Sequence, residues 1–272
     1  MTTAPSPADA PAFYDDMWRR YAHLDRVSPA AFHRRRMIAK LARRYARGAR
    51  RALDVGCGQG ELLRELERAL PGATVDGADL SEQSLRDTRV DNPAAELFVV
   101  DLSAAALETT LAARLGAYDL VVCSEVVEHI DDDAGAVGRL AQFLAPGGTL
   151  IVTVPGGRMS RFDEAIGHFR HYRPRALARL LHASGLEVVR VLAWGFPFHS
   201  FYRSAVRVAS RWSMPRVRAA SSTPEDGRGG VSTSVLGAAY GVFGRALKPL
   251  FYLNASRFGE QLLAVARRPR EP

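Results

Sequence analysis

The sequence predicts an α/β protein built on a doubly wound, mostly parallel sheet of seven strands, with helices at the N-terminus and a helical insertion before the last strand. Three observations support this prediction. Short apolar runs alternate with helical stretches from about residue 50 onward. A glycine-rich turn joins the first run to the next helix, and aspartates stand just past the second and third runs. Strand–helix–strand units of this length form right-handed crossovers, which make neighbouring strands parallel.

The N-terminal region is expected to be a mobile tail over residues 1–11, followed by a helical lid over residues 12–48. An apolar stripe at helical spacing predicts the first lid helix, over residues 12–25. The second helix is predicted to begin at Ser28-Pro29, since serine caps helix N-termini and proline suits the first turn. Gly48 can end this helix, because glycine readily adopts the left-handed conformation.

An α/β core is expected over residues 49–194. Its strands are predicted at residues 52–55, 74–78, 97–100, 119–123, 149–154 and 186–193, and its helices at residues 61–70, 82–90, 104–115, 133–144 and 174–184. A helical insertion or lid is expected over residues 195–260, with a flexible stretch at 221–234 that is rich in serine, glycine and charge. Residues 261–272 are expected to form the last strand, over 261–267, and a tail.

The composition is that of an ordinary globular protein, with 47% apolar and 24% charged residues. The two cysteines, Cys57 and Cys123, lie in different motifs and lack metal-ligand spacing. We therefore expect reduced thiols and a cytoplasmic protein. No apolar run reaches membrane-spanning length, and the N-terminus lacks the pattern of a signal peptide, so no transmembrane segment is expected.

The charge is distributed unevenly along the chain. The net charge is +8, yet residues 52–157 hold 18 acidic side chains and only six arginines. The remainder of the chain is therefore strongly basic. Such a division is typical of basic flanks that meet an anionic partner, and equally of arginine-rich helices that only face solvent. The sequence leaves both interpretations open.

The glycine-rich turn has the pattern Gly56-x-Gly58-x-Gly60, between a predicted strand and a predicted helix. Glycine allows a sharp turn and a close approach of the backbone to a ligand. Dinucleotide-binding proteins use a related pattern, G-x-G-x-x-G, and hold a pyrophosphate on the helix N-terminus. Here Asp54 and Glu61 flank the turn. Carboxylates at both ends favour a cationic, amine-bearing ligand over a pyrophosphate.

Five stretches in order resemble the class I S-adenosylmethionine-dependent methyltransferase family, particularly its small-molecule branch. They are Leu53–Gly60, Gly77–Ser81, Val100–Leu102, Ser124–Ile130 and Pro146–Leu150. The resemblance spans about residues 50–193 and implies a Rossmann-like methyltransferase fold, methyl-transfer activity and S-adenosylmethionine as the cofactor.

The resemblance also implies roles for individual residues. Asp79 would accept hydrogen bonds from the ribose hydroxyls, and Asp101 would accept from the adenine amino group. The predicted cofactor contacts are Asp54, Gly56, Cys57, Gly58, Gly60, Asp79, Leu80, Asp101, Leu102 and Glu125. The alternatives are a helix-capping role for Asp79, a turn role for Asp101 and a purely structural role for Glu125.

Methyl transfer from a sulfonium needs an aligned acceptor and, where necessary, removal of a proton. The candidate bases are His168, His171, Glu125 and His129. The first two belong to a Gly-His-x-Arg-x-Tyr stretch, residues 167–172, which in the resembled branch commonly lies at the substrate edge of the sheet. The predicted substrate contacts are Tyr14, Trp18, Arg170, Tyr172, Phe198 and Tyr202. The alternative for the stretch is a loop that braces the fold.

The lid helices suggest the character of the acceptor. The insertion is rich in aromatic side chains, and Arg203, Arg207 and Arg211 recur at helical spacing. We expect a partly apolar small molecule that bears an anionic group, such as a natural product, a lipid or a nucleotide-sugar intermediate. The aromatic side chains can instead be core, and contact of the same helices with a membrane surface stays open.

Some site classes are not expected. Asp131–Asp133 offer poor octahedral geometry and are better explained as acidic residues at a helix N-terminus, so no metal is predicted. The chain lacks the Asn/Asp-Pro-Pro-Tyr/Phe stretch and the Pro-Cys turn of enzymes that methylate nucleic acid bases, so no nucleic-acid partner is expected. The alternatives are methylation of RNA or protein and a non-catalytic cofactor-binding module. The methylated atom and the oligomeric state stay open.

Overall fold

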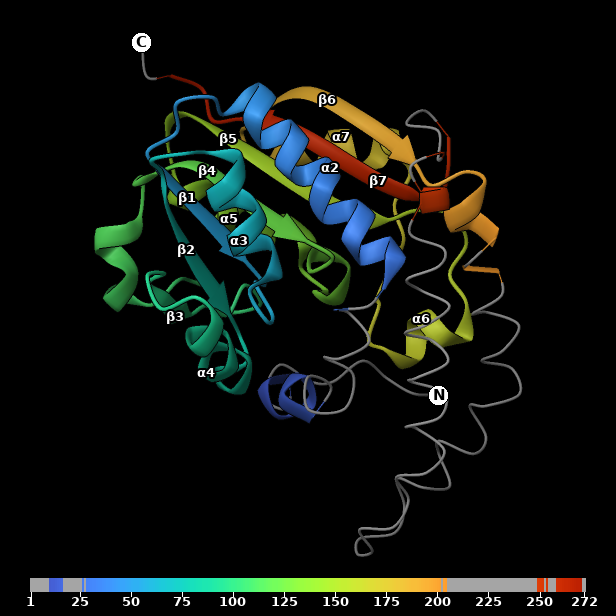
Figure 1. Cartoon of the computed structure of the whole chain (residues 1–272), viewed down its shortest axis with the longest axis horizontal. Coiled ribbons are helices and arrows are strands. Elements are labelled where there is room, and N and C mark those ends of the chain that lie inside the picture. The colour runs from blue at the N-terminus through green and yellow to red at the C-terminus, as the bar shows by residue number, and fades with distance from the viewer. Residues whose placement is uncertain are drawn as a thin grey trace, which may run out of the picture.

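The computed structural model describes residues 10–16, 26, 28–201, 203–204, 249–251, 253 and 258–270. Seven strands form one sheet in the order β3-β2-β1-β4-β5-β7-β6 (Figure 1). The strands are β1 Arg51–Val55, β2 Thr74–Asp79, β3 Leu97–Val99, β4 Tyr118–Ser124, β5 Leu144–Pro155, β6 Glu187–Trp194 and β7 Gln261–Arg267. The predicted fold class is thereby confirmed.

The strand order positions the site. Strands β1 to β5 run parallel to one another, and β7 runs antiparallel to both β5 and β6. The chain winds from β1 outward to β3 and then returns to β4 on the other side of β1. In open α/β sheets, ligands bind at the carboxyl ends of the strands where the winding reverses. That point lies here between β1 and β4.

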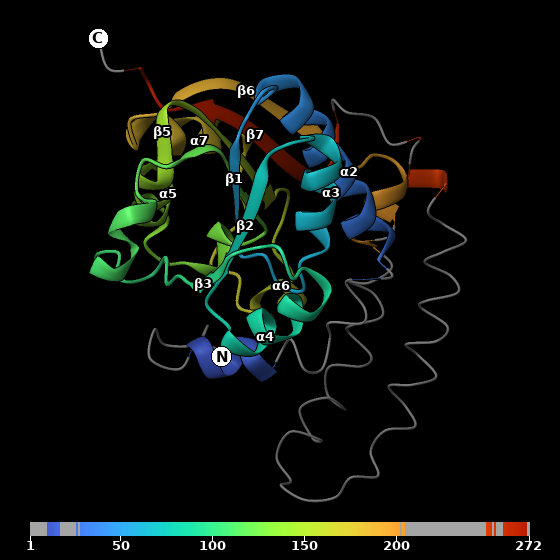
Figure 2. The same cartoon turned by 60° about the vertical axis from the view of Figure 1, so that its left-hand side comes forward.

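Helices cover both faces of the sheet. The α-helices are α2 Pro29–Tyr45, α3 Glu61–Ala69, α4 Glu82–Asp91, α5 Asp133–Phe143, α6 Arg161–Ala165 and α7 Pro174–Ala183. Figure 2 shows α2 and α3 on one side of the sheet and α5 and α7 on the other. A further helix, over residues 10–16, lies beside α4 in both views.

The apolar strand patterns follow from this covering. In β4, Val121 and Cys123 pack with the α5 side, whereas Leu120 and Val122 pack with the α2 and α3 side. All four side chains are fully buried. Successive side chains of a strand point to opposite faces, so a strand covered on both faces reads as an unbroken apolar run.

The structure differs from the predictions in four places, the first being β5, which begins at Leu144, five residues before the predicted strand at 149–154. Residues 104–115 were expected to be helical, but only Thr109–Arg114 form a helix, of the 3-10 type. Leu111 is the one buried residue of this 3-10 helix, so tertiary packing covers little of the predicted apolar face and gives a longer helix little support. Helical structure starts at residue 10, inside the expected tail, and α6 was not predicted. Trp18, Tyr202 and residues 205–248, including the expected flexible stretch 221–234, lie outside the described residues.

None of the helices in the described ranges has the length and apolar character needed to cross a bilayer.

Candidate functional site

The turn over residues 56–60, called the glycine loop below, crosses the carboxyl end of β1 and meets β2. Gly56, Gly58 and Gly60 all have positive φ angles, of 78°, 52° and 73°. A Cβ on Gly56 would lie 2.2 Å from a methyl carbon of Val126, and one on Gly60 would lie 2.4 Å from the Asn92 side chain. Both conformation and space therefore require glycine at these two positions.

Asp79 ties the glycine loop to the helix that follows β2. One carboxylate oxygen accepts from the backbone N–H of Gly58 at 2.9 Å, and the other accepts from the N–H of Ser81 at 2.9 Å. Burial raises the pKa of Asp79, and these backbone donors oppose the rise. Ser81 caps α4 through its side chain. Ser81 is the cap of α4, so Asp79 is not needed as the cap.

Asp54 stands at the base of the glycine loop, almost fully buried. Its Oδ1 has no hydrogen-bond partner among the described residues. Burial and the nearby Asp79 raise its pKa to about 8, whereas Arg34 of α2 lowers it. The Arg34 guanidinium also lies 3.8 Å from the Glu125 carboxylate, and its Nε finds no partner within the described residues. The site therefore combines several acids with one arginine.

Cys57 and Asp101, two of the predicted cofactor contacts, also make contacts within the protein. The Cys57 side chain is buried in the apolar layer beneath α3, so only its backbone can face a ligand at the loop. Asp101 closes a turn: its Oδ1 accepts from the backbone N–H and the hydroxyl of Ser103, at 2.7 and 2.6 Å. The turn alternative holds, and it leaves the second oxygen of Asp101 for another donor. Leu102 is buried and Leu80 is half-buried.

Glu125 follows β4 in a strained conformation. Its φ is 58°. Within the described residues, Glu125 is the one non-glycine residue with a positive φ. Its N–H donates to Thr153 O at 2.9 Å, and the Thr153 hydroxyl donates to its carboxylate at 3.0 Å. Such a conformation persists only where the surroundings hold it, and it is typical of functional sites.

Beside Glu125 lies a group that we call the Glu128 cluster, made of Glu128, His129 and His168. Glu128 is fully buried, and neither carboxylate oxygen has a hydrogen-bond partner among the described residues. Burial and the Glu125 charge raise its pKa well above the usual range. The rings of His129 and His168 meet edge to face with centroids 4.6 Å apart. Burial lowers the pKa of His129 to about 4 and that of His168 to about 2, so both are neutral at neutral pH.

Tyr14 brings the N-terminal helix into the same site. Its ring lies edge-on to His129, with centroids 5.7 Å apart. Burial, and to a smaller extent the charges of Glu128 and Asp79, raise the pKa of the Tyr14 phenol. Its neighbour Asp15 accepts a hydrogen bond from Ser81. Of the other aromatic residues predicted to contact substrate, Phe198 is half-buried near the base of the insertion.

Arg170 and Tyr172 both pair with acidic residues at the start of α5. The Arg170 guanidinium pairs with Asp131 at 2.8 Å and with Asp133 at 3.0 Å. The Tyr172 hydroxyl donates to Asp133 at 2.9 Å, and its ring is buried in the core. The alternative interpretation of the 167–172 stretch holds for these two residues. Asp132 caps α5 by accepting from Gly135 N–H, as the acidic run predicted.

The comparisons with known proteins agree with this geometry. A family model described as a methyltransferase domain matches residues 29–191. The chain belongs to the S-adenosylmethionine-dependent methyltransferase family. Among its relatives, the ubiquinone biosynthesis O-methyltransferase of Aromatoleum aromaticum is 31% identical over 166 residues, which cover 54% of this chain and 68% of the relative.

Solved structures show the same fold at lower identity. The [4+2]-cyclase SpnF matches with a TM-score of 0.61 at 16% identity, over 99% of each chain. Phosphoethanolamine N-methyltransferase 2 of Haemonchus contortus also has a TM-score of 0.61 at 16% identity, over 97% of this chain and 59% of that one. One of these proteins is named as a cyclase, so the fold by itself does not determine the reaction.

The acids and the arginine fit the methyltransferase cofactor. S-adenosylmethionine carries a sulfonium, an amine, a carboxylate and a ribose diol. Asp54 and Asp79 provide buried carboxyl groups at the glycine loop, and Arg34 provides a cation whose Nε has no partner among the described residues. The close approach of Val126 and Asn92 to the loop leaves space only for glycine. The residues present therefore suit a ligand of this chemistry.

Three site residues of the methyltransferase were not singled out from the sequence: Arg34, Glu128 and Asp163. Glu128 lies within a motif that was recognised, and its spacing of three from Glu125 was the available signal. Arg34 and Asp163 gave no local signal, because their partners lie in distant segments. Asp163 is buried and pairs with Arg203 at 2.9 Å.

Ligand atoms of the Glu128 cluster lie within 4.8 Å of one another, as do those of Asp163, His168 and His171. Groups of this composition hold metals in some proteins. Here Arg203 supplies the positive charge on Asp163, and His171 contacts His168. We assign no metal to either group.

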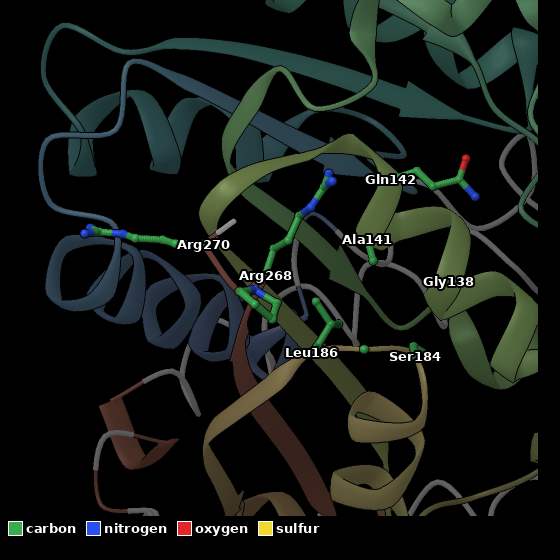
Figure 3. A pocket seen from close by; sticks show the side chains of 9 residues that line it. Gly138, Ala141, Gln142, Ser184, Leu186, Arg268 and Arg270 are labelled. Atoms are coloured by element: carbon green, nitrogen blue, oxygen red, sulfur yellow. The ribbon is translucent and has the colours of Figure 1, made fainter. Parts of the chain in front are cut away.

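The pocket in Figure 3 lies away from this site. It is lined by the end of α5, the turn before β6 and the segment after β7, with Arg268 and Arg270 beside Leu186. These elements lie at the edge of the sheet where the parallel strands begin. The Glu128 cluster and the glycine loop lie at the opposite edge, and they contribute nothing to the pocket.

Proposed function

We propose that this methyltransferase transfers a methyl group to a hydroxyl of a small-molecule acceptor, which binds between the glycine loop and the Glu128 cluster. The observation that carries the proposal is the Glu128 carboxylate, fully buried and without a hydrogen-bond partner among the described residues. Leaving such a group unpartnered costs free energy. A bound molecule that donates hydrogen bonds would remove this cost.

The cofactor side follows from the charges. When bound, S-adenosylmethionine supplies an electrophilic methyl group on a cationic sulfur. We assign the ribose hydroxyls to Asp79, the buried carboxylate at the end of β2 beside the glycine loop. Asp54 would face the amine and Arg34 the carboxylate of the methionine part. The second oxygen of Asp101 would accept from the adenine amino group.

The acceptor side provides alignment and proton removal. A hydroxyl becomes a better nucleophile when a neighbouring group accepts its proton. His129 and His168 are neutral imidazoles, and each has a nitrogen that can accept. The Tyr14 ring against His129 supplies an apolar wall beside these polar atoms. This combination suits a partly apolar molecule with a hydroxyl group.

We do not propose an anionic group on the acceptor, because the arginines expected to bind it are paired with acids or lie outside the described residues. Arg170 pairs with Asp131 and Asp133, and Arg203 pairs with Asp163. Arg207 and Arg211 lie outside the described residues. The relatives support methylation of oxygen through their name, O-methyltransferase, and do not specify the acceptor here.

The test incubates the protein with radiolabelled S-adenosylmethionine and a cell extract. The extract is then separated into small molecules, lipids, nucleic acids and proteins, and the label in each fraction is measured. We expect label in the small-molecule or lipid fraction, in an alkali-stable methyl ether. Asp79→Ala should give no label, and Asp87→Ala, which alters an exposed aspartate of α4, should label like the wild type.

Other distributions of the label would contradict the proposal. Label in nucleic acid or protein would make the basic flanks the binding surface, with activity that falls steeply as salt increases. Cofactor binding without label in any fraction, in extracts and with purified hydroxyl acceptors, would indicate a binding module.

A further inference from the structure

A second concave region lies at the edge of the sheet where the parallel strands begin, opposite the glycine loop. It is a cleft of about 620 Å³ between the end of α2 with the following turn, the first residues of β5 and the segment that leaves β7. The pocket of Figure 3 adjoins it and shares residues 268–270. Small-molecule sites commonly have volumes of about 300–1,000 Å³, so this cleft is large enough for a ligand.

We call this region the arginine cleft, because Arg47, Arg267, Arg268 and Arg270 line it. Arg47, Arg267 and Arg270 are exposed, and none of the three forms an ion pair with a described residue. Arg268 is half-buried and donates to the Leu144 carbonyl at 2.7 Å. The cleft therefore gathers cations from the end of α2 and from the last strand, which are distant in sequence.

The acids of the arginine cleft do not balance these cations. Asp119 and Glu187 line it together with the four arginines, so the lining has a net charge of +2. One Asp119 oxygen already accepts from the backbone N–H groups of Arg50 and Arg51, at 2.8 and 3.1 Å. An anionic ligand would find an excess of positive charge and guanidinium donors that no described carboxylate occupies.

The backbone holds the cleft in a defined shape. The N–H of Gly147 donates to Arg268 O at 3.0 Å, and the N–H of Arg268 donates to Gly148 O at 2.9 Å. Gly147 has a φ of 78°, and a Cβ added there would lie 3.1 Å from Arg270 Nε. The Arg270 side chain thus lies against a turn that has no side chain of its own, and its base is fixed by the pairing of the two segments.

We propose that the arginine cleft binds a small soluble ligand that carries a diphosphate or triphosphate group. Guanidinium groups bind phosphate oxygens through paired, charge-assisted hydrogen bonds. Several guanidiniums around one concave surface favour a ligand with more than one negative charge. The site lies apart from the glycine loop and the Glu128 cluster, so this inference goes beyond the proposed methyl transfer and does not depend on it.

The lining favours such a ligand over a membrane surface or a nucleic acid. None of the large exposed apolar side chains of the described residues lines the cleft, so it lacks groups that insert into a bilayer. Among the described lining residues, Tyr45 is the one aromatic side chain, and the Arg44 guanidinium lies 5.4 Å from its ring centre. Successive bases of a single strand would find no stacking platform there.

The first test is calorimetric titration of the full-length protein with sodium tripolyphosphate. Saturating S-adenosylhomocysteine is present to fill the cofactor site. We expect one saturable site, and Arg47→Gln/Arg270→Gln should weaken binding at least about tenfold, because two charge-assisted contacts are lost. Arg268 is left unchanged, since its bond to Leu144 supports the fold. Absence of saturable binding to the wild type would overturn the inference.

The matched control is Arg89→Gln/Arg175→Gln. These arginines lie on α4 and α7, are exposed, form no ion pair with a described residue and do not line the cleft. The control removes the same charge as the test variant, so it should bind tripolyphosphate within about twofold of the wild type. An equal loss in both double variants would mean that the arginines act only through net charge, which would overturn the inference.

The second test compares phosphate sources and locates the ligand. Inorganic phosphate should bind at least about tenfold more weakly than tripolyphosphate, and equal affinity would contradict the need for several charges. Adenosine triphosphate that binds more tightly than tripolyphosphate would assign a nucleotide, and equal affinity an inorganic polyphosphate. Amide NMR shifts on adding tripolyphosphate should change at Gly147 and Gly148. Changes at Gly56 and Gly58 instead, or binding only to anionic vesicles or RNA, would overturn the inference.

Discussion

The two sides of the site are built by different means. The cofactor side uses β1 to β3, and its groups lie within short stretches of sequence that are joined by backbone hydrogen bonds to Ala78 and Asp79. The acceptor side uses the segments after β4 and β5. Its groups come from Tyr14, the Glu128 cluster and Asp163, which are far apart in sequence and meet through side chains.

This difference separates binding from turnover. A backbone-built pocket depends on conformation and on a few buried carboxylates, so changes there should reduce cofactor affinity or stability. A side-chain-built pocket can lose one group and keep its shape, so changes there should reduce the rate at nearly constant affinity. The following changes test this contrast, from the largest expected effect to the smallest.

Asp79→Ala should have the largest effect. It removes the proposed ribose acceptor and leaves the buried N–H groups of Gly58 and Ser81 without a partner. Hydrogen bonds to charged groups contribute about 1.5–3 kcal/mol each, so we expect cofactor affinity to fall by about 100-fold or more. Calorimetric titration with S-adenosylhomocysteine measures this, with Asp87→Ala as the control. A loss of less than about threefold would remove Asp79 from the binding site.

Gly56→Ala should destabilise the protein by about 2–4 kcal/mol, because it combines a positive φ with overpacking. The new Cβ would lie 2.2 Å from a Val126 methyl carbon. Gly72→Ala is the control, since Gly72 has a φ of 87° but no atom within 4 Å of the added Cβ. It should cost about 1–2 kcal/mol. Equal losses in urea unfolding would mean that the close approach at Gly56 is not a constraint.

Glu128→Gln should separate stability from activity. Because the folded pKa of Glu128 is raised, the folded protein binds more protons than the unfolded chain above the ordinary pKa of a glutamate. The wild type therefore loses stability as pH rises through this window, and the glutamine variant does not. We expect a higher unfolding temperature for the variant at pH 8, together with at least about tenfold slower turnover. Equal pH dependence in both proteins would place Glu128 in a polar environment.

His33→Gln, in the scaffold that both sides of the site share, should have the smallest effect. Burial, with a smaller contribution from Arg36, lowers the pKa of His33 on α2 to about 4. Its ring lies 5.1 Å from the Trp194 ring. The His33 imidazole therefore binds a proton more readily in the unfolded chain than in the folded protein. Its contribution to the free energy of unfolding is present above about pH 6.5 and is lost as the pH falls towards 4. His33→Gln should flatten this part of the pH profile of thermal unfolding, without ligand. An unchanged profile would assign the loss to other groups.

Much of the cofactor side could be predicted from the sequence because its signals are local. The glycine pattern, the aspartate that ends β2 and Ser81 as the cap of α4 each depend on residues within a few positions. Strand assignments succeeded for the same reason, since a strand covered on both faces is an unbroken apolar run. The expected helix at residues 104–115 was wrong in extent: the leucines have helical spacing, but within the 3-10 helix the fold buries only Leu111.

The acceptor side could be predicted only in part. His129 and His168 stay predicted candidate bases, which the structure brings into contact, and Arg170, predicted to meet substrate, pairs with Asp131 and Asp133. The charge of a side chain is visible in the sequence, whereas its partner is not. An arginine on a loop is available to a ligand only when no carboxylate from another element reaches it first.

The sequence by itself determined the fold class, the glycine loop and the identity of the buried acids at the strand ends, because these follow from local periodicity and backbone conformation. Only the tertiary structure decided which acids keep unpartnered oxygens, which arginines are neutralised and which imidazoles touch. Glu128, Arg203 and the His168–His171 pair depend on these contacts. Electrostatic and hydrogen-bond interactions act over a few ångströms, and only folding brings groups from distant segments within that range.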